Sequence, residues 1–162
     1  MKYEIVEINE KIVMGLSDRI KNNDTMLEKI INLWNNFCNE NGGIINKINK
    51  RINENTVAIY YNYNNEKDGY KEIEYDNLVG CEVENQDTKN ELTKVVIPKG
   101  KYAKFTFFGN PDTEINKFWR NFWVNVENKV YDFDRAFTYD FEEYIAGNDF
   151  DNMEVDIYIS IK

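Results

Sequence analysis

The order of predicted secondary-structure elements occurs twice along the 162-residue chain. In each half, hydrophobic periodicity predicts two strands, one amphipathic helix and two further strands. The segment Trp34–Phe37 (WNNF) matches Trp119–Phe122 (WRNF), and both lie on the apolar stripe of their helix. The strands are expected at residues 3–8, 12–17, 56–63, 71–84, two within 95–109, 137–145 and 153–161, and the helices at about 24–41 and from 110 onward.

This duplication predicts a single α+β domain over residues 1–162, with copies at about 1–86 and 91–162 related by approximate two-fold symmetry. Only two copies fit in the chain, so a repeat solenoid is not indicated. Two similar half-domains leave a seam where they meet, and such seams are common places for ligand pockets. We therefore expect a pocket between the two halves.

Composition excludes several classes of site. The chain contains no His and only two Cys, which excludes His-based triads and dyads, His-ligated metals and disulfide scaffolds, and we predict no cofactor. With 20 basic and 29 acidic residues the net charge is −9, which argues against direct nucleic-acid binding. No apolar run has the length of a membrane span and no signal peptide is recognised, so we predict no membrane association and a cytoplasmic location.

Glu142 is the carboxylate that we single out as a ligand-binding candidate. It lies within residues 130–156, which hold nine acidic residues and a single basic one. Strand alternation places Glu142 and Tyr144 on one face, and Tyr158 on the polar face of the last strand. If the aliphatic faces of these strands meet the helices, the three side chains would line the groove together. The alternative is a solvated carboxylate on an exposed face of the sheet.

Aromatic residues make up 15% of the chain, and several could form the walls of a pocket. The alignment of the two copies matches Tyr61 with Glu142, which predicts that Tyr61 lies across the groove from the carboxylate. The helical stripes favour the core for Trp34, Trp119 and Trp123, although one edge of Trp119 could reach the seam. A carboxylate among such rings suits a lipophilic cation, because charge neutralisation and cation–π contact act together.

A set of motifs runs in order along almost the whole chain. The first half contains IVMGLSDRI, LWNNF, TVAIYYNY and LVGCEVE, and the second contains VVIPKGKYAKFTFFG, FWRNFW, YDFEEY and MEVDIYISI. This set resembles the GyrI-like small-molecule-binding domain, the effector-binding domain of AraC-type and MerR-type regulators. The resemblance implies tandem strand-helix-strand-strand modules that form one antiparallel sheet with two main helices and a central groove. It also implies that the groove accepts lipophilic, often cationic compounds, with the acidic motif residue at Glu142 and a motif aromatic at Tyr102.

The first hypothesis is a stand-alone effector-binding protein for small lipophilic, cationic or aromatic molecules, acting in drug sensing, in sequestration, or in transcription regulation through a protein partner. The predicted ligand-binding residues are Glu142, Tyr102, Tyr144, Tyr61, Tyr158 and Trp119. Two alternatives stay open: a small hydrolase with Glu142 as general base and Tyr102 orienting the substrate, or an acidic protein-interaction module. The first strand is expected to begin at residue 3, which leaves no room for a preceding helix-turn-helix, so direct regulation of DNA is not predicted.

Overall fold

The computed structural model describes residues 1–39, 41–64, 73–84 and 92–162. The predicted loop around Gly69, the start of the strand expected from residue 71 and the expected boundary between the copies at 86–91 lie outside the described residues. Within the described ranges, no helix combines the length and the hydrophobicity that a membrane span requires.

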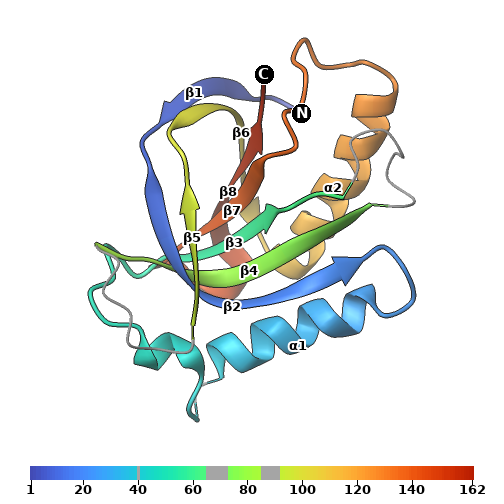
Figure 1. The fold of residues 1–162 in the computed structure, drawn as a ribbon. Coiled ribbons are helices and arrows are strands. Elements are labelled where there is room, and N and C mark those ends of the chain that lie inside the picture. The colour runs from blue at the N-terminus through green and yellow to red at the C-terminus, as the bar shows by residue number, and fades with distance from the viewer. Residues whose placement is uncertain (40, 65–72, 85–91) are drawn as a thin grey trace.

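The elements follow the predicted order, with some ends displaced (Figure 1). The strands are β1 (Glu4–Ile8), β2 (Lys11–Lys21), β3 (Thr56–Tyr61), β4 (Glu74–Glu82), β5 (Thr93–Ile97), β6 (Gly100–Gly109), β7 (Tyr139–Ile145) and β8 (Met153–Ser160). The helices are α1 (Met26–Cys38) and α2 (Pro111–Glu127), with the short 3₁₀ turns η1 (Ile44–Lys47) and η3 (Phe150–Asn152). The second strand is therefore longer than predicted, and the first helix ends earlier.

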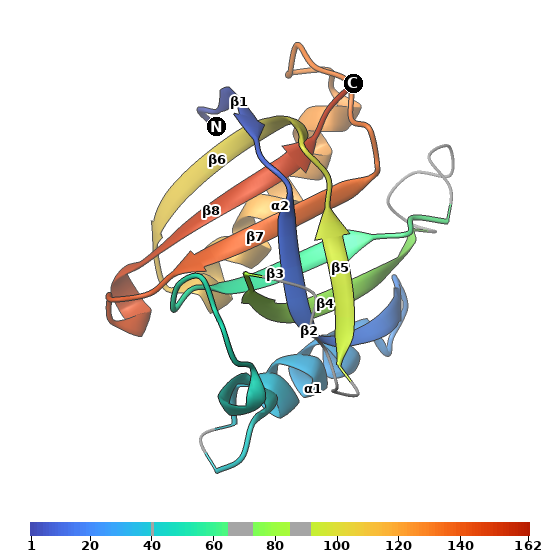
Figure 2. The same cartoon turned by 60° about the vertical axis from the view of Figure 1, so that its left-hand side comes forward.

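The eight strands form one antiparallel sheet in the order β1-β6-β8-β7-β3-β4-β2-β5. This order reads the same from either edge when β1–β4 are matched to β5–β8. The first strand of each half pairs with the other half, because β1 lies beside β6 and β5 lies beside β2 (Figure 2). The predicted tandem modules with pseudo-two-fold symmetry, forming one antiparallel sheet, are confirmed.

The pseudo-two-fold axis passes between the central strands β3 and β7. In their ladder, Ala58 pairs with Glu142 and Tyr60 pairs with Asp140. An axis through the Ala58–Glu142 pair relates Tyr60 to Tyr144, since each lies two residues further along its strand. Residues that pair directly share a face of the sheet, so all five of these side chains lie on the same side.

Both long helices pack on this side of the sheet, one for each half. From α1, Leu33 and Phe37 join a core with residues of β2, β3 and β4. From α2, Phe118 and Phe122 join a second core with residues of β6 and β8. The start of α2 is set by Pro111, whose missing N–H would be unpaired at a first helical position anyway.

A third core fills the face of the curled sheet that is turned away from the helices. Its buried members come from seven strands, β2 to β8, and include Ile59, Tyr102, Phe141 and Tyr158. Phe141 and Tyr158 stack with ring centroids 4.4 Å apart. The sheet therefore has a helix side and a far side, each with its own packing.

Candidate ligand-binding site

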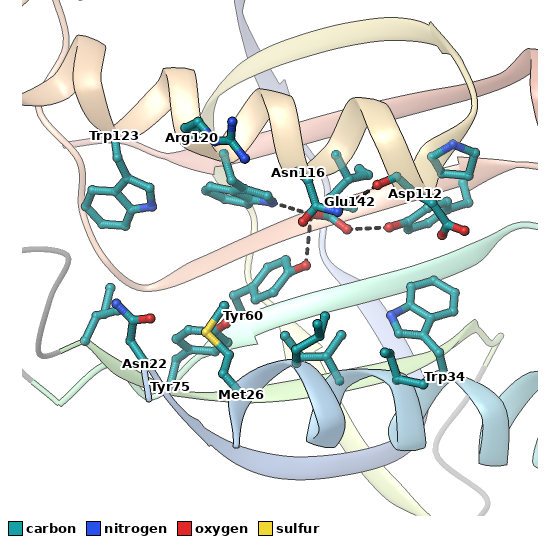
Figure 3. A pocket seen from close by; sticks show the side chains of 18 of the residues that line it. Asn22, Met26, Trp34, Tyr60, Tyr75, Asp112, Asn116, Arg120, Trp123 and Glu142 are labelled. Carbon is teal, nitrogen blue, oxygen red and sulfur yellow. Dashed lines mark hydrogen bonds between the residues drawn. The ribbon is translucent and has the colours of Figure 1, made fainter. Parts of the chain in front are cut away.

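A cavity of about 1400 Å³ lies between α1 and α2, on the helix side of β3, β4 and β7. Pockets for small ligands usually measure about 300–1,000 Å³, so this cavity can hold a bulky molecule. Met26 and Trp34 line it from α1, and Trp119 and Trp123 line it from α2. In Figure 3, Glu142 lies between the two helices, with Trp123 toward one end of the cavity and Trp34 toward the other.

Glu142 is almost fully buried at this cavity, with an exposed fraction of 1%. One carboxylate oxygen, Oε1, accepts hydrogen bonds from the Tyr60 hydroxyl at 2.9 Å and from the Trp119 indole N–H at 2.6 Å. The other, Oε2, accepts from the Tyr144 hydroxyl at 2.6 Å. Neutral donors therefore fix both oxygens of the carboxylate in place (Figure 3).

The protonation of this cluster follows from its burial. Burial raises the pKa of Glu142 above the ordinary carboxyl value, and the hydrogen bonds from Tyr144, Trp119 and Tyr60 lower it by less than burial raises it. Burial, and then the charge of Glu142, raise the pKa of Tyr60 and Tyr144 well above the ordinary phenol value, so both remain donors at neutral pH. Among the described residues, no Lys or Arg forms an ion pair with Glu142.

Two Tyr–Trp pairs flank the carboxylate, one from each half of the pseudo-symmetric domain. Tyr60 meets Trp119 edge-to-face with ring centroids 5.5 Å apart, and Tyr144 meets Trp34 in the same way at 4.9 Å. The two-fold axis exchanges these pairs but passes through the Ala58–Glu142 pair. Because the partner of Glu142 on the axis is an alanine, the pair on the axis holds a single carboxylate, which lies between the two aromatic pairs.

A second buried carboxylate lies on the same face of β7. Asp140 is fully buried and accepts hydrogen bonds from Arg135, from the Tyr63 hydroxyl at 2.8 Å, and from the backbone N–H and hydroxyl of Ser160 at 2.7 and 2.8 Å. Arg135 forms an ion pair with it through Nη2 and also lines the cavity. Unlike Glu142, this carboxylate has a cation as a permanent partner.

Three of the predicted site residues come together at the cavity: Glu142, Tyr144 and Trp119. Their role in ligand binding stays a prediction. The other three, Tyr102, Tyr158 and Tyr61, pack in the core on the far side of the sheet and do not line the cavity. In particular, Tyr102 cannot orient a substrate at Glu142, as the hydrolase alternative required.

The misplacement of Tyr158 follows from the face of the sheet that we chose for the groove, whereas Tyr102 was placed there by the family resemblance alone. We expected the groove on the face opposite the helices, whereas Glu142 pairs with Ile157, which packs under α2. Tyr158 pairs with Phe141, the neighbour of Glu142, and therefore points to the far side together with Tyr102. The expectation that Tyr158 and Glu142 share a face was wrong.

The placement of Tyr61 was wrong because the internal alignment was shifted by three residues: Ala58, not Tyr61, is the symmetry partner of Glu142. Tyr61 pairs with Tyr139 and stacks on its ring, with centroids 6.1 Å apart. A shift by an odd number of residues moves a side chain to the other face of a strand. The tyrosine that reaches Glu142 is the preceding residue, Tyr60, which is the symmetry partner of Tyr144.

Sequence reasoning also missed several cavity residues. Trp34 and Trp123 were assigned to the core, but both are only half-buried and line the cavity. Tyr60 and Arg135, which were not selected as site residues, also line it. The matched motifs WNNF and WRNF already pointed to a wall role for Trp34 once Trp119 was selected. Within the described part of the chain, no three Cys, Asp or Glu side chains are grouped in a way that could hold a metal ion.

Comparison with known proteins agrees with this architecture. The sequence profile of the Cass2 family, described as integron-associated effector binding protein, matches residues 4–161. The crystal structure of the integron cassette protein VCH_CASS2 from the mobile metagenome of Vibrio cholerae is similar, with 25% identity and a TM-score of 0.74, covering 99% of this chain and 95% of that one. No curated protein sequence matches the chain.

Two further structures share the fold at lower identity. SAV2435 bound to tetraphenylphosphonium has 14% identity and a TM-score of 0.75, covering 100% of this chain and 94% of that one. EcmrR in its DNA complex has 17% identity and a TM-score of 0.62, covering 99% of this chain and 57% of that one. The resemblance to GyrI-like effector-binding domains is therefore confirmed, and the chain belongs to the Cass2 family of integron-associated effector binding proteins.

Proposed function

We propose that this effector-binding protein takes up lipophilic cations that carry aromatic rings, and that Glu142 supplies the counter-charge. The observation that carries the proposal is a carboxylate 1% exposed and held by three neutral donors, with no Lys or Arg ion-paired to it among the described residues. A buried carboxylate without a cation is costly in free energy. A bound cation would offset that cost, which a neutral ligand cannot do.

The walls of the cavity suit the apolar part of such a ligand. Trp34 and Tyr144 on one side, and Trp119 and Tyr60 on the other, present ring edges and faces around Glu142. A cation over an aromatic face gains about 0.5–2 kcal/mol, the more so when it is desolvated. The volume of about 1400 Å³ leaves room for several rings around one charge.

The similar fold of SAV2435, whose structure holds tetraphenylphosphonium, supports this ligand class. For the biological role, we propose drug sensing or sequestration in the cytoplasm, with any effect on transcription passed through a protein partner. EcmrR supports the last possibility, since a domain like this one makes up part of a protein that is seen in a DNA complex.

Isothermal titration with tetraphenylphosphonium tests the proposal at neutral pH. We expect wild-type protein to bind the cation and to quench Trp fluorescence, and Glu142→Gln to weaken binding at least about tenfold, since it removes the buried carboxylate that would neutralise the cation. Glu143→Gln is the matched control: its side chain lies on the far side, 3.9 Å from Lys11, and should leave the affinity unchanged. Equal affinities of wild type and Glu142→Gln, or no binding at all, would overturn the proposal.

A further inference from the structure

Arg135 has two buried nitrogens that no described residue satisfies. The residue is 6% exposed and lines the cavity, and its Nη2 is bonded to Asp140. Its Nε and Nη1 are buried and have no hydrogen-bond partner among the described residues. Unpaired buried donors are rare because each carries a desolvation penalty, so a pair of them on one side chain calls for a physical reason.

The surroundings of the guanidinium are aromatic. Its central carbon lies 4.1 Å from the ring centroid of Phe137 and 4.6 Å from that of Trp123. Aromatic rings attract the positive charge, but they are much weaker hydrogen-bond acceptors than an oxygen atom. The charge of Arg135 is therefore accommodated, while its N–H groups are not.

The position of Arg135 relative to Glu142 follows from the backbone. Asp140, which holds Arg135, and Glu142 lie two residues apart on the same face of β7, about 7 Å along the strand. On α2, Trp119 donates a hydrogen bond to Glu142, and the ring of Trp123 lies against the Arg135 guanidinium. The two Trp residues are four positions apart, which is about one helical turn, or about 6 Å along the helix axis. In Figure 3, Trp123 lies at one end of the cavity and Glu142 nearer its middle.

We propose that Arg135 forms a second polar subsite of the cavity, in which the guanidinium N–H groups donate a hydrogen bond to a neutral carbonyl oxygen of the ligand. The carbonyl, of a ketone or an amide, would stand about one aromatic ring away from the cationic centre held by Glu142. A neutral acceptor is favoured over a carboxylate, because Asp140 already balances the charge of Arg135 and would repel a second anion. This subsite rests on the proposed function of the cavity and narrows its ligand class.

Two derivatives of tetraphenylphosphonium test the subsite by titration calorimetry. One carries a para-carboxamide on a single ring, and the other carries the nearly isosteric para-isopropyl group. Without a partner for its carbonyl, the carboxamide would bind more weakly, since an unpaired amide is costly to bury. With Arg135 as donor, we expect the carboxamide to bind at least five times more tightly than the isopropyl derivative in the wild-type protein. Equal or weaker binding would overturn the proposal.

Two variants assign the preference to a residue. Arg135→Met combined with Asp140→Asn removes both charges of the buried pair, so no lone charge is left behind, and it should reverse the preference toward the isopropyl derivative. Arg120→Met is the control, since Arg120 is an exposed arginine that also lines the cavity from α2, and it should keep the wild-type preference. Loss of the preference in Arg120→Met would place the subsite at that residue and contradict the assignment. If the double variant does not fold, two results still test the proposal: whether the wild-type protein prefers the carboxamide, and whether Arg120→Met keeps that preference.

The failure of this subsite can be told apart from the failure of the proposed function. If neither derivative binds, and tetraphenylphosphonium does not bind either, both proposals fall. If all three cations bind but the carboxamide has no advantage, only the subsite falls, and the role of Glu142 stands.

Discussion

Asp140 and Glu142 are two buried carboxylates on the same face of one strand, and their partners differ in kind. Asp140 accepts from Arg135, Tyr63 and both polar groups of Ser160, so its charge is balanced within the fold. Among the described residues, Glu142 accepts from Tyr60, Trp119 and Tyr144, which carry no charge.

The difference separates a structural role from a binding role. Asp140 links β7 to β8 through Ser160 and to the segment before β7 through Arg135, so its contacts stabilise the fold. Glu142 is positioned just as firmly, but its charge lacks a cation among the described residues, and burial raises its pKa. A buried charge that costs folding free energy is expected at a binding site, where a ligand of opposite charge offsets that cost.

The largest expected difference between the two carboxylates is in their effect on the stability of the fold. Asp140→Asn leaves the Arg135 guanidinium buried without its anion, which should lower the free energy of unfolding by about 3–5 kcal/mol. Glu142→Gln removes a charge that folding disfavours, so stability at neutral pH should stay the same or rise. Urea denaturation of both variants beside the wild type measures the two effects, and similar losses in both variants would show that the carboxylates have the same role.

The pH dependence should also differ in sign from that of a salt-bridged carboxylate. The pKa of Glu142 is raised in the folded state, so its contribution to stability is full below the ordinary carboxyl pKa and is lost as the pH rises through the raised pKa. Relative to Glu142→Gln, the wild type should therefore lose stability with rising pH over that window. Denaturation midpoints of the two proteins across this range measure the effect, and a gain in place of the loss would contradict it.

Binding of a permanent cation should follow the opposite trend. Tetraphenylphosphonium does not titrate, so its affinity should fall as the pH drops below the raised pKa of Glu142, by at most about tenfold per pH unit. The same titration on Glu142→Gln supplies the control and should show no such slope. A slope that persists in this variant would mean that another group titrates at the site.

Removal of one tyrosine hydroxyl that is hydrogen-bonded to Glu142 should shift the pH dependence of cation binding. Tyr60→Phe or Tyr144→Phe deletes one hydrogen bond to the carboxylate, which is worth about 1.5 kcal/mol or more for a charged acceptor, so the pKa of Glu142 should rise further. The midpoint of cation binding should rise accordingly. Tyr61→Phe is the matched control, because Tyr61 lies on the far side of the sheet and should leave the midpoint unchanged.

The order of the elements could be predicted because each element carries its own local signal. In α2, Pro111 marks the start, and Phe118, Trp119 and Phe122 recur at helical spacing. In β8, aliphatic residues alternate with polar ones over the whole strand. The duplicated order then led to two pseudo-symmetric modules, and the shared sheet of Figure 1 has that symmetry.

The site could be predicted only in part, because it depends on pairing between strands. Alternation along one strand correctly placed Glu142 and Tyr144 on the same face. It could not show which face meets the helices, and that face is decided by the pairing of Glu142 with Ile157 rather than with Tyr158. A long-range register of this kind leaves no local trace in the sequence.

The ion pair between Arg135 and Asp140 could not be predicted from the sequence either. Arg135 lies in an irregular segment between α2 and β7, where an isolated bridge to Ile161 is its only described ladder contact. Such a segment has no hydrophobic period from which the direction of a side chain could be inferred. The charge balance that distinguishes Asp140 from Glu142 therefore emerges only from the folded chain.

The most direct test of the contrast is an NMR titration of the carboxyl carbon of Glu142, assigned by its loss in Glu142→Gln and recorded with and without tetraphenylphosphonium. We expect a pKa above the ordinary carboxyl value in the free protein, and a lower pKa when the cation is bound. An ordinary pKa that the cation leaves unchanged would contradict the central claim that Glu142 is a buried carboxylate whose charge is neutralised by a bound cation.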